Sequence, residues 1–190
     1  MIFRQLFDHS TWTYTYLLGD PTSREAIIID PVLEQIERDI KLLEELDLKL
    51  VYIFDTHVHA DHITGAGELR KRTGAQTVTS EAAAVACANI NAPHGSSFSF
   101  GPYDVELRST PGHTEGCASY IVEDGETTYA FTGDSLFIRG SGRTDFQQGD
   151  SRTLYRSVHE QIYSLPDSTL IYPGHDYRGH QVSTVGEEKA

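Results

Sequence analysis

The sequence has few cysteines, no long apolar segment and no excess of basic residues, and each shortage excludes a class of protein. Its two cysteines, Cys87 and Cys117, are too few for a disulfide framework and fit a reducing compartment. No apolar run approaches the ~20 residues that a membrane helix requires. Acidic residues outnumber basic ones by 28 to 15, for a formal net charge of −13, which disfavours nucleic acid and anionic membrane surfaces as partners. An anionic substrate therefore needs a locally positive pocket.

The N-terminus also lacks a targeting pattern. Residues 1–6 form neither a basic region followed by an apolar stretch nor an Arg-rich presequence, so we predict a cytoplasmic protein. The length of 190 residues fits one compact domain, and a composition of 38% hydrophobic and 23% charged residues is typical of a globular chain. No repeat, low-complexity tract or linker divides the chain. We therefore predict a single domain over residues 1–190.

Strand-like and helix-like patterns alternate along the chain. Short apolar runs predict strands near residues 14–18, 26–29, 48–54, 76–79, 105–109, 118–122, 127–131 and 169–172. Apolar residues in steps of three and four, together with capping residues, predict helices over 33–46, 63–72, 80–89 and 151–164. The pair Asp124-Gly125 favours a tight hairpin between two of the strands. This mixture indicates layered sheets with helices outside.

The strongest motif is His57-Val58-His59-Ala60-Asp61-His62, directly after the apolar run 48–54. In extended chain His57 and His59 project to the same side, and a turn brings Asp61 and His62 to the same cavity. A helix from residue 63 onward would add positive potential there. Histidine is the commonest metal ligand, so we predict a metal site; the alternative is a polar surface loop.

Three shorter motifs repeat the pattern of a strand that ends in a small-residue turn with a candidate ligand. They are Pro111-Gly112-His113-Thr114, Thr132-Gly133-Asp134-Ser135 and Pro173-Gly174-His175-Asp176. Each is weak alone, because Gly-Asp after a strand is usually only a turn. With the first cluster they supply five histidines and two aspartates, enough for one or two metal ions. The other histidines, His9, His94, His159 and His180, are predicted to be surface or packing residues.

Taken in order, the four motifs resemble the metallo-β-lactamase superfamily along nearly the whole chain. The resemblance implies an αββα sandwich, in which two mixed β-sheets pack together with helices on the outer faces and the metal lies at one edge between them. Within the superfamily, the segments Thr56–Gly65, Ile138–Asp150 and Tyr172–Tyr177 look like the persulfide dioxygenases, also called sulfur dioxygenases. Such enzymes oxidise glutathione persulfide with dioxygen and water to sulfite and glutathione.

The resemblance also implies one ferrous iron, Fe(2+), per chain, held by His57, His113 and Asp134. Two histidines and one carboxylate leave about three positions open on octahedral iron(II), which is room for a sulfur ligand and dioxygen. The remaining members of the motifs then orient the iron ligands and anchor waters by hydrogen bonds, or remain from a second metal site. These residues are His59, Asp61, His62 and His175.

Family resemblance places Arg143 and Tyr177 near the metal as catalytic and substrate-binding residues. The Arg143 guanidinium can bind a carboxylate or the developing oxidised sulfur, and the Tyr177 hydroxyl can donate a hydrogen bond near the iron. The alternative for Arg143 is a structural ion pair with Asp145 or Asp150. For Tyr177 the alternative is a packed ring with its hydroxyl in solvent.

The turn after His113 supplies two further candidates. Thr114 either hydrogen-bonds the substrate or caps the turn. Cys117 resembles a nucleophile in position, but nothing in the sequence lowers its pKa, and the reaction implied by the family places the reactive sulfur on the substrate. We therefore predict that Cys117 is inert.

Two other functions remain open. A glyoxalase II-like hydrolase of glutathione thioesters would hold one metal on His57, His59, His113 and Asp134 and another on Asp61, His62, Asp134 and His175. The segment Gly142–Gly149 favours the dioxygenase, and the chain is expected to end before the C-terminal helical domain of the hydrolases. A noncatalytic module that relays sulfur to a partner is the second alternative. The family also implies a homodimer, and basic residues that hold glutathione are expected beyond Ala190.

Overall fold

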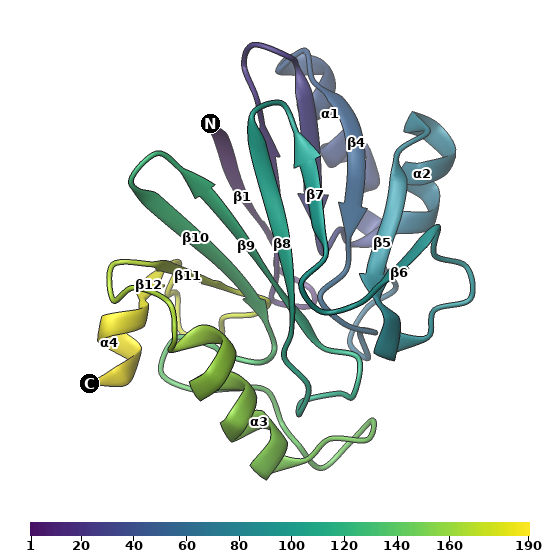
Figure 1. Ribbon diagram of the computed structural model, residues 1–190. Helices are drawn as coiled ribbons and strands as arrows, with labels where there is room; N and C mark the ends of the chain where they lie inside the picture. The colour runs from purple at the N-terminus through teal and green to yellow at the C-terminus, as the bar shows by residue number, and fades with distance from the viewer.

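Two six-stranded sheets pack face to face in the computed structural model, which describes residues 1–190 (Figure 1). The first sheet has the order β1 (Ile2–Asp8), β2 (Thr13–Gly19), β3 (Glu25–Ile29), β4 (Lys49–Phe54), β5 (Gln76–Ser80) and β6 (Ile90–Ala92). The second has the order β12 (Ser183–Thr184), β11 (Leu170–Pro173), β10 (Thr127–Gly133), β9 (Ala118–Asp124), β8 (Tyr103–Ser109) and β7 (Ser97–Phe100). Both sheets mix parallel and antiparallel pairs.

Helices cover the outer faces of both sheets. On the first sheet, α1 (Ile36–Glu45) and α2 (Ala66–Thr73) bury Ile36, Leu43 and Leu69 against strands β2 to β4. On the second, α3 (Ser151–Ser157) continues through a π-helical turn at Val158–Ile162, and α4 (Val185–Lys189) follows β12. These four layers are the αββα sandwich predicted from the sequence. No helix in the structure is long and apolar enough to cross a membrane.

An aromatic core fills the space between the sheets, and two of its tyrosines also fix loops at one edge. Tyr16 and Tyr120 are almost fully buried. The Tyr16 hydroxyl, on the first sheet, donates to the carbonyl of Pro173 at 2.6 Å, and the Tyr120 hydroxyl, on the second, donates to the carbonyl of Asp55 at 2.8 Å. Each net bond is worth about 1 kcal/mol. The first bond holds the segment before His175 on the first sheet, and the second holds the segment before His57 on the second sheet. Each sheet is thus bonded to a ligand-bearing segment of the other sheet.

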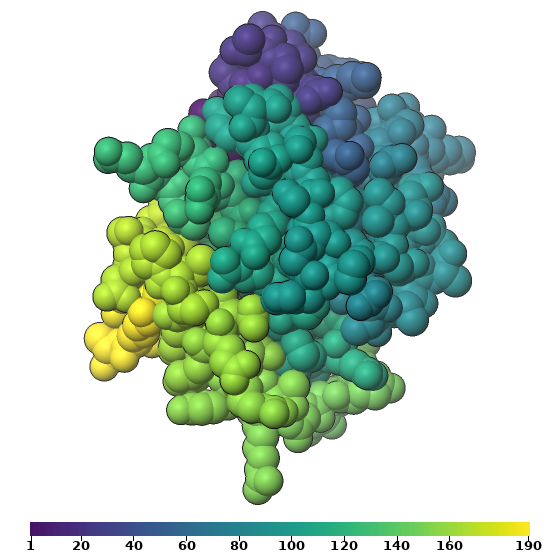
Figure 2. All heavy atoms as spheres, in the orientation of Figure 1, coloured from purple at the N-terminus to yellow at the C-terminus, as the bar shows by residue number.

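Strands β4, β8, β10 and β11 all end at the same edge of the sandwich, the lower edge in Figure 1. Backbone hydrogen bonds connect the turns that follow these strands to one another and to neighbouring strands. The amide of Ala118 donates to the carbonyl of Thr56, that of Gly174 to Gly133, and that of Tyr14 to Gly174, at 2.8, 2.9 and 2.8 Å. The four predicted motifs are thereby brought to one place, although they span more than a hundred residues of sequence. In the space-filling view the early residues at the top and right pack directly on the later residues at the lower left (Figure 2).

The structure confirms the predicted hairpin and corrects two helices. Asp124 pairs with Thr127 across a two-residue turn. The helix predicted over 80–89 is wrong: only one 3₁₀ turn forms there, and Ala84 ends it with φ of 49°. The helix predicted to begin at residue 63 begins at Ala66 instead, because Thr64 pairs as a β-bridge with Val32. The positive potential expected from that helix start therefore lies farther along the chain than predicted.

Candidate metal centre

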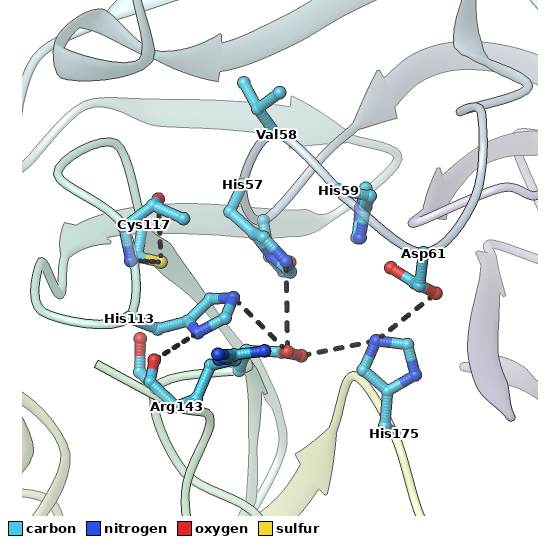
Figure 3. A network of polar contacts seen from close by, with 12 residues as sticks. His57, Val58, His59, Asp61, His113, Cys117, Arg143 and His175 are labelled. Carbon is cyan, nitrogen blue, oxygen red and sulfur yellow. Dashed lines mark hydrogen bonds and ion pairs between the residues drawn. The ribbon is translucent and has the colours of Figure 1, made fainter. Parts of the chain in front are cut away.

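Three side chains from three different strand ends converge on one point. His57 follows β4, His113 follows β8, and Asp134 follows β10, and all three are buried. The Nε2 atoms of His57 and His113 lie 4.0 and 3.5 Å from Asp134 Oδ2 (Figure 3). The three candidate ligand atoms lie within 4.8 Å of one another. This places together the set that the sequence predicted as metal ligands.

The proton on His57 can be assigned from its neighbours. The Thr56 hydroxyl donates its only hydrogen to Asp30 Oδ2 at 2.8 Å. It therefore accepts a hydrogen bond from Nδ1 of His57, which lies 3.0 Å away. With the hydrogen on Nδ1, the Nε2 atom of His57 keeps its lone pair and faces Asp134. Burial and the neighbouring histidines hold the pKa of His57 well below its usual value, so the ring is neutral at pH 7.

The same reasoning holds for His113 and His175, whose Nδ1 atoms face backbone carbonyls. His113 Nδ1 donates to the Arg143 carbonyl at 2.7 Å, and His175 Nδ1 donates to the Trp12 carbonyl at 3.2 Å. A carbonyl can only accept, so both hydrogens are on Nδ1. In the neutral rings the Nε2 atoms then carry lone pairs, and that of His175 points at Asp134 Oδ1 from 3.5 Å (Figure 3).

With these rings neutral, Asp134 is surrounded by acceptor atoms, and no side chain donates a hydrogen bond to its carboxylate. Its Oδ1 atom is buried without a hydrogen-bond partner, and burial raises the pKa of this carboxyl above its usual value. Lone pairs that face one another in a buried site repel unless a cation lies between them. A divalent transition metal satisfies the imidazole nitrogens and the carboxylate together. The donor set therefore fits a metal ion.

A second group of donors lies beside the first and consists of His59, Asp61 and His62, with ligand atoms within 4.8 Å of one another. His62 Nδ1 donates to Asp61 Oδ2 at 2.9 Å, and His59 Nε2 lies 3.2 Å from Asp30 Oδ1. Burial lowers the pKa of His59, but the Asp30 carboxylate outweighs it, and the pKa rises to about 9. His59 is therefore protonated at neutral pH and bound to Asp30.

The metal-facing residues open into a cavity of about 400 Å³, whose wall includes Arg143, Phe146 and Tyr177. The Tyr177 ring stacks on His175 with 6.0 Å between the ring centroids and is 60% exposed. Phe146 is also half exposed at the mouth, and the Arg143 guanidinium lies 5.7 Å from its ring centroid. The site is therefore reached from solvent past aromatic side chains, and a small molecule can enter it.

Similarity to known proteins assigns the chain to a family. Residues 13–175 match the Metallo-beta-lactamase superfamily. The chain is 54% identical over 190 residues to the mitochondrial persulfide dioxygenase ETHE1 of Mus musculus, with 100% of this chain and 74% of the relative covered. The chain belongs to the metallo-beta-lactamase superfamily, and within it to the persulfide dioxygenase family.

A solved structure and a more distant relative agree with that assignment. The crystal structure of ETHE1 from Myxococcus xanthus superposes with a TM-score of 0.95 at 51% identity, covering 100% of this chain and 82% of the other. A hydroxyacylglutathione hydrolase of Brucella ovis is 36% identical over 167 residues, covering 86% of this chain and 62% of the relative. The chain is thus more similar to the dioxygenases than to this hydrolase.

Of the other predicted site residues, Arg143 lines the cavity and Thr114 does not. The Arg143 guanidinium forms a bidentate pair with Asp145 at 2.7 and 2.9 Å, which is the ion pair weighed as its alternative. Thr114 is buried with its hydroxyl 3.2 Å from Cys117 Sγ, and it is not part of the cavity wall. Arg143 can therefore meet a substrate, while Thr114 fixes the turn after His113.

Sequence reasoning missed two residues behind the ligands, Asp30 and Thr56. Asp30 accepts hydrogen bonds from the Thr56 backbone amide and hydroxyl, at 2.7 and 2.8 Å, and also contacts His59. It is almost fully buried and has φ of 51°, in the left-handed region that non-glycine residues rarely adopt. An aspartate directly after the apolar strand β3 is the signal that could have revealed it. Asp30 holds both His59 and the Thr56 hydroxyl that orients His57.

The two cysteines are expected to react at very different rates. Cys87 is exposed, whereas burial raises the pKa of Cys117 to about 11. At pH 8, iodoacetamide should label Cys87 in the native protein, and Cys117 should react more than about 100-fold more slowly, because so little of it is thiolate. Mass spectrometry after timed labelling measures both rates.

Unfolded protein labelled at both positions is the control for that experiment, and Cys87→Ser should leave no fast-reacting thiol. Labelling of Cys117 in the native protein at the rate of Cys87 would contradict the inert assignment.

Proposed function

We propose that this chain is an iron(II)-dependent persulfide dioxygenase, with one iron per chain, that converts glutathione persulfide, dioxygen and water into glutathione, sulfite and two protons. The observation that carries the proposal is the 54% identity over the full chain to a persulfide dioxygenase. The convergence of His57, His113 and Asp134 supports it, since two imidazoles and one carboxylate are typical ligands of non-haem iron(II) oxygenases. When bound, the iron supplies open coordination positions and redox chemistry that zinc lacks.

The chain's own residues prepare the site for this metal. Thr56 and the Arg143 carbonyl hold hydrogens on Nδ1 of His57 and His113, so that both Nε2 lone pairs face the metal position. Such partners fix the ring orientation before the metal binds. The ligand side chains therefore lose their conformational entropy when the protein folds, and not when the metal or substrate binds.

Tyr177 and Arg143 are suited to bind the persulfide. Burial, together with the nearby Asp134 and Asp61 carboxylates, raises the pKa of Tyr177 above its usual value, so its hydroxyl stays protonated and can donate a hydrogen bond. The Arg143 guanidinium lines the same cavity; its Nε and Nη2 atoms bind Asp145, and its Nη1 atom is left to donate to an anionic group. Phe146 and Tyr177 flank the mouth and offer apolar ring surface to the carbon chain of a substrate.

The second donor group is held partly by the protein's own contacts, and the choice of one metal rather than two rests on the similarity to the dioxygenases. His59 Nε2 lies 3.2 Å from Asp30 Oδ1, which leaves Nδ1 as its only ring nitrogen without a partner. The Nδ1 atom of His59 and the Nε2 atom of His62 are buried without partners, which suits ordered water. We therefore assign His59, Asp61, His62 and His175 to orienting and water-binding roles.

Metal analysis combined with oxygen uptake tests the proposal. Protein purified without oxygen is expected to contain about one iron per chain and to form one sulfite for each dioxygen consumed. Removal of iron with a chelator should abolish oxygen uptake, and iron(II) but not zinc should restore it. Two metals per chain, with thioester hydrolysis and no oxygen uptake, would instead establish the hydrolase; sulfur transfer without turnover would establish a relay module.

Three further expectations stay predictions. We propose a homodimer, a cytoplasmic location and a single domain over residues 1–190. The mouse relative is named as mitochondrial, so fractionation of cells that express this chain is the direct test of its location. Light scattering of the purified protein tests the dimer.

A further inference from the structure

A second cavity adjoins the metal cavity and has no role in the function proposed above. Its volume is about 240 Å³, and it lies between the turn Phe137–Ser141 and the segment His175–Arg178. Phe137, His175 and Tyr177 line both cavities. A molecule with its sulfur at the metal can therefore extend its other end past Tyr177 into this side cavity.

The side cavity contains the one arginine near the metal that has no acidic partner. Arg143 is paired with Asp145, and Arg139, which also lines the side cavity, is paired with Glu187 at 3.2 Å. Arg178 is exposed and forms no salt bridge in the structure. An unpaired guanidinium at the entrance of a site in a chain of net charge −13 is available to an anionic ligand.

The backbone holds Arg178 at this entrance, and the nearest acid on its own segment is already occupied. The Oδ2 atom of Asp176 accepts the backbone amides of Arg178 and His180 at 2.9 and 2.6 Å. Asp176 is buried, so its carboxylate fixes the turn rather than neutralising the guanidinium. The result is a fixed turn that presents a free, bidentate donor toward the side cavity.

We infer that the side cavity is a subsite for a carboxylate of the thiol that carries the persulfide, and that Arg178 binds this carboxylate. The inference rests on the proposed function and adds to it a preference for thiols that bear a carboxylate. A guanidinium matches a carboxylate through two parallel hydrogen bonds, which an ammonium cannot form. Arg178 is a binding residue in this assignment and takes no part in the oxidation.

Trp12 provides a direct reporter of binding, because it is the only tryptophan in the chain. Its ring is 46% exposed, and its centroid lies 6.2 Å from that of Tyr177, which lines both cavities. A ligand that passes Tyr177 should change the fluorescence of Trp12. The reaction product glutathione serves as the probe, since it has carboxylates and is stable without oxygen.

The test compares the wild-type enzyme with Arg178→Ala, Arg178→Lys and the control Arg152→Ala. Arg152 is exposed on α3, has no ion pair and lines neither cavity. In anaerobic titrations followed by Trp12 fluorescence, Arg178→Ala should weaken glutathione binding about tenfold, Arg178→Lys should recover part of this loss, and Arg152→Ala should bind as the wild type does.

Steady-state kinetics give the second measurement. The ratio of kcat/KM for glutathione persulfide to kcat/KM for the persulfide of uncharged 2-mercaptoethanol should fall about tenfold in Arg178→Ala, mainly through KM. An unchanged ratio, or an unchanged fluorescence titration, would overturn the subsite. If the wild type oxidises no persulfide, the proposed function fails, while the glutathione titration still decides whether Arg178 binds a carboxylate.

Discussion

Asp134→Asn is expected to abolish oxygen uptake and to change thermal stability in opposite directions with and without metal. Loss of the carboxylate charge should lower iron affinity by more than about 100-fold, since changes to the partners of metal ligands alone cost about 10–100-fold. In protein stripped of metal, the same substitution should raise the Tm by roughly 2–8 °C, because Asp134 Oδ1 is buried without a partner and asparagine removes that charge. Metal analysis and calorimetry measure the two effects.

The opposite signs of the two Tm changes distinguish a metal ligand from a carboxylate that stabilises the fold directly. A carboxylate that stabilises the fold by itself would lower the Tm in both states when replaced. The control is Asp104→Asn, at an exposed position on β8, which should change stability by less than about 0.5 kcal/mol in either state. A lower Tm for Asp134→Asn in metal-free protein would contradict the assignment of Asp134 to the metal.

The ligand motifs could be predicted because their signal is local. Each ligand follows an apolar strand, and strands of one sheet that run in the same direction end at the same edge. His113 and Asp134 meet for that reason, whereas His57 follows β4 of the first sheet and joins them because the two sheets pack face to face. Asp30 carries the same signal after β3 but stands alone, without histidine or glycine beside it. Its role depends on tertiary contacts with Thr56 and His59, which no sequence pattern specifies.

The helix predicted over residues 80–89 failed because asparagine side chains at and just after its end bind Thr77 and Thr79 of the neighbouring strand β5. The Asn89 side-chain carbonyl accepts the backbone amide and the hydroxyl of Thr77, both at 3.0 Å, and Asn91 accepts from the Thr79 hydroxyl at 2.9 Å. These contacts hold the segment extended as it enters β6, where residues 90–92 pair with β5. The alanines of this segment favour a helix, but the tertiary contacts outweigh that preference.

The strands at the sheet margins were missed for a different reason. β1 has short apolar pairs interrupted by Arg4 and Gln5 rather than one apolar run, and most of its residues are partly exposed, while β12 has only two residues. β2, the partner of β1, was predicted from its apolar run, and all its residues are buried. Apolar runs thus identify the central strands of each sheet, whereas edge strands are defined by their pairing.

Gly112→Ala is expected to destabilise the fold by about 4 kcal/mol or more. Gly112 has φ of 138°, which side chains rarely adopt, and an added Cβ would lie 2.3 Å from the Cα of Leu154. Backbone strain costs about 1–3 kcal/mol and overpacking against a helix backbone about 1–3 kcal/mol more. Because the Gly112 carbonyl accepts the amide of Asp150 just before α3, the helix cannot move away without losing this bond. Urea unfolding measures the loss.

Gly125→Ala is the matched control, because Gly125 also has positive φ, at 63°, but a Cβ there meets nothing within 4 Å. Strain alone should cost about 1–2 kcal/mol at this hairpin. The difference between the two variants therefore measures the close approach of α3 to the turn that carries His113. Equal losses would show that backbone strain accounts for both. A larger loss at Gly112, accompanied by weaker iron binding in the fraction that folds, would show that packing of α3 holds His113 in place.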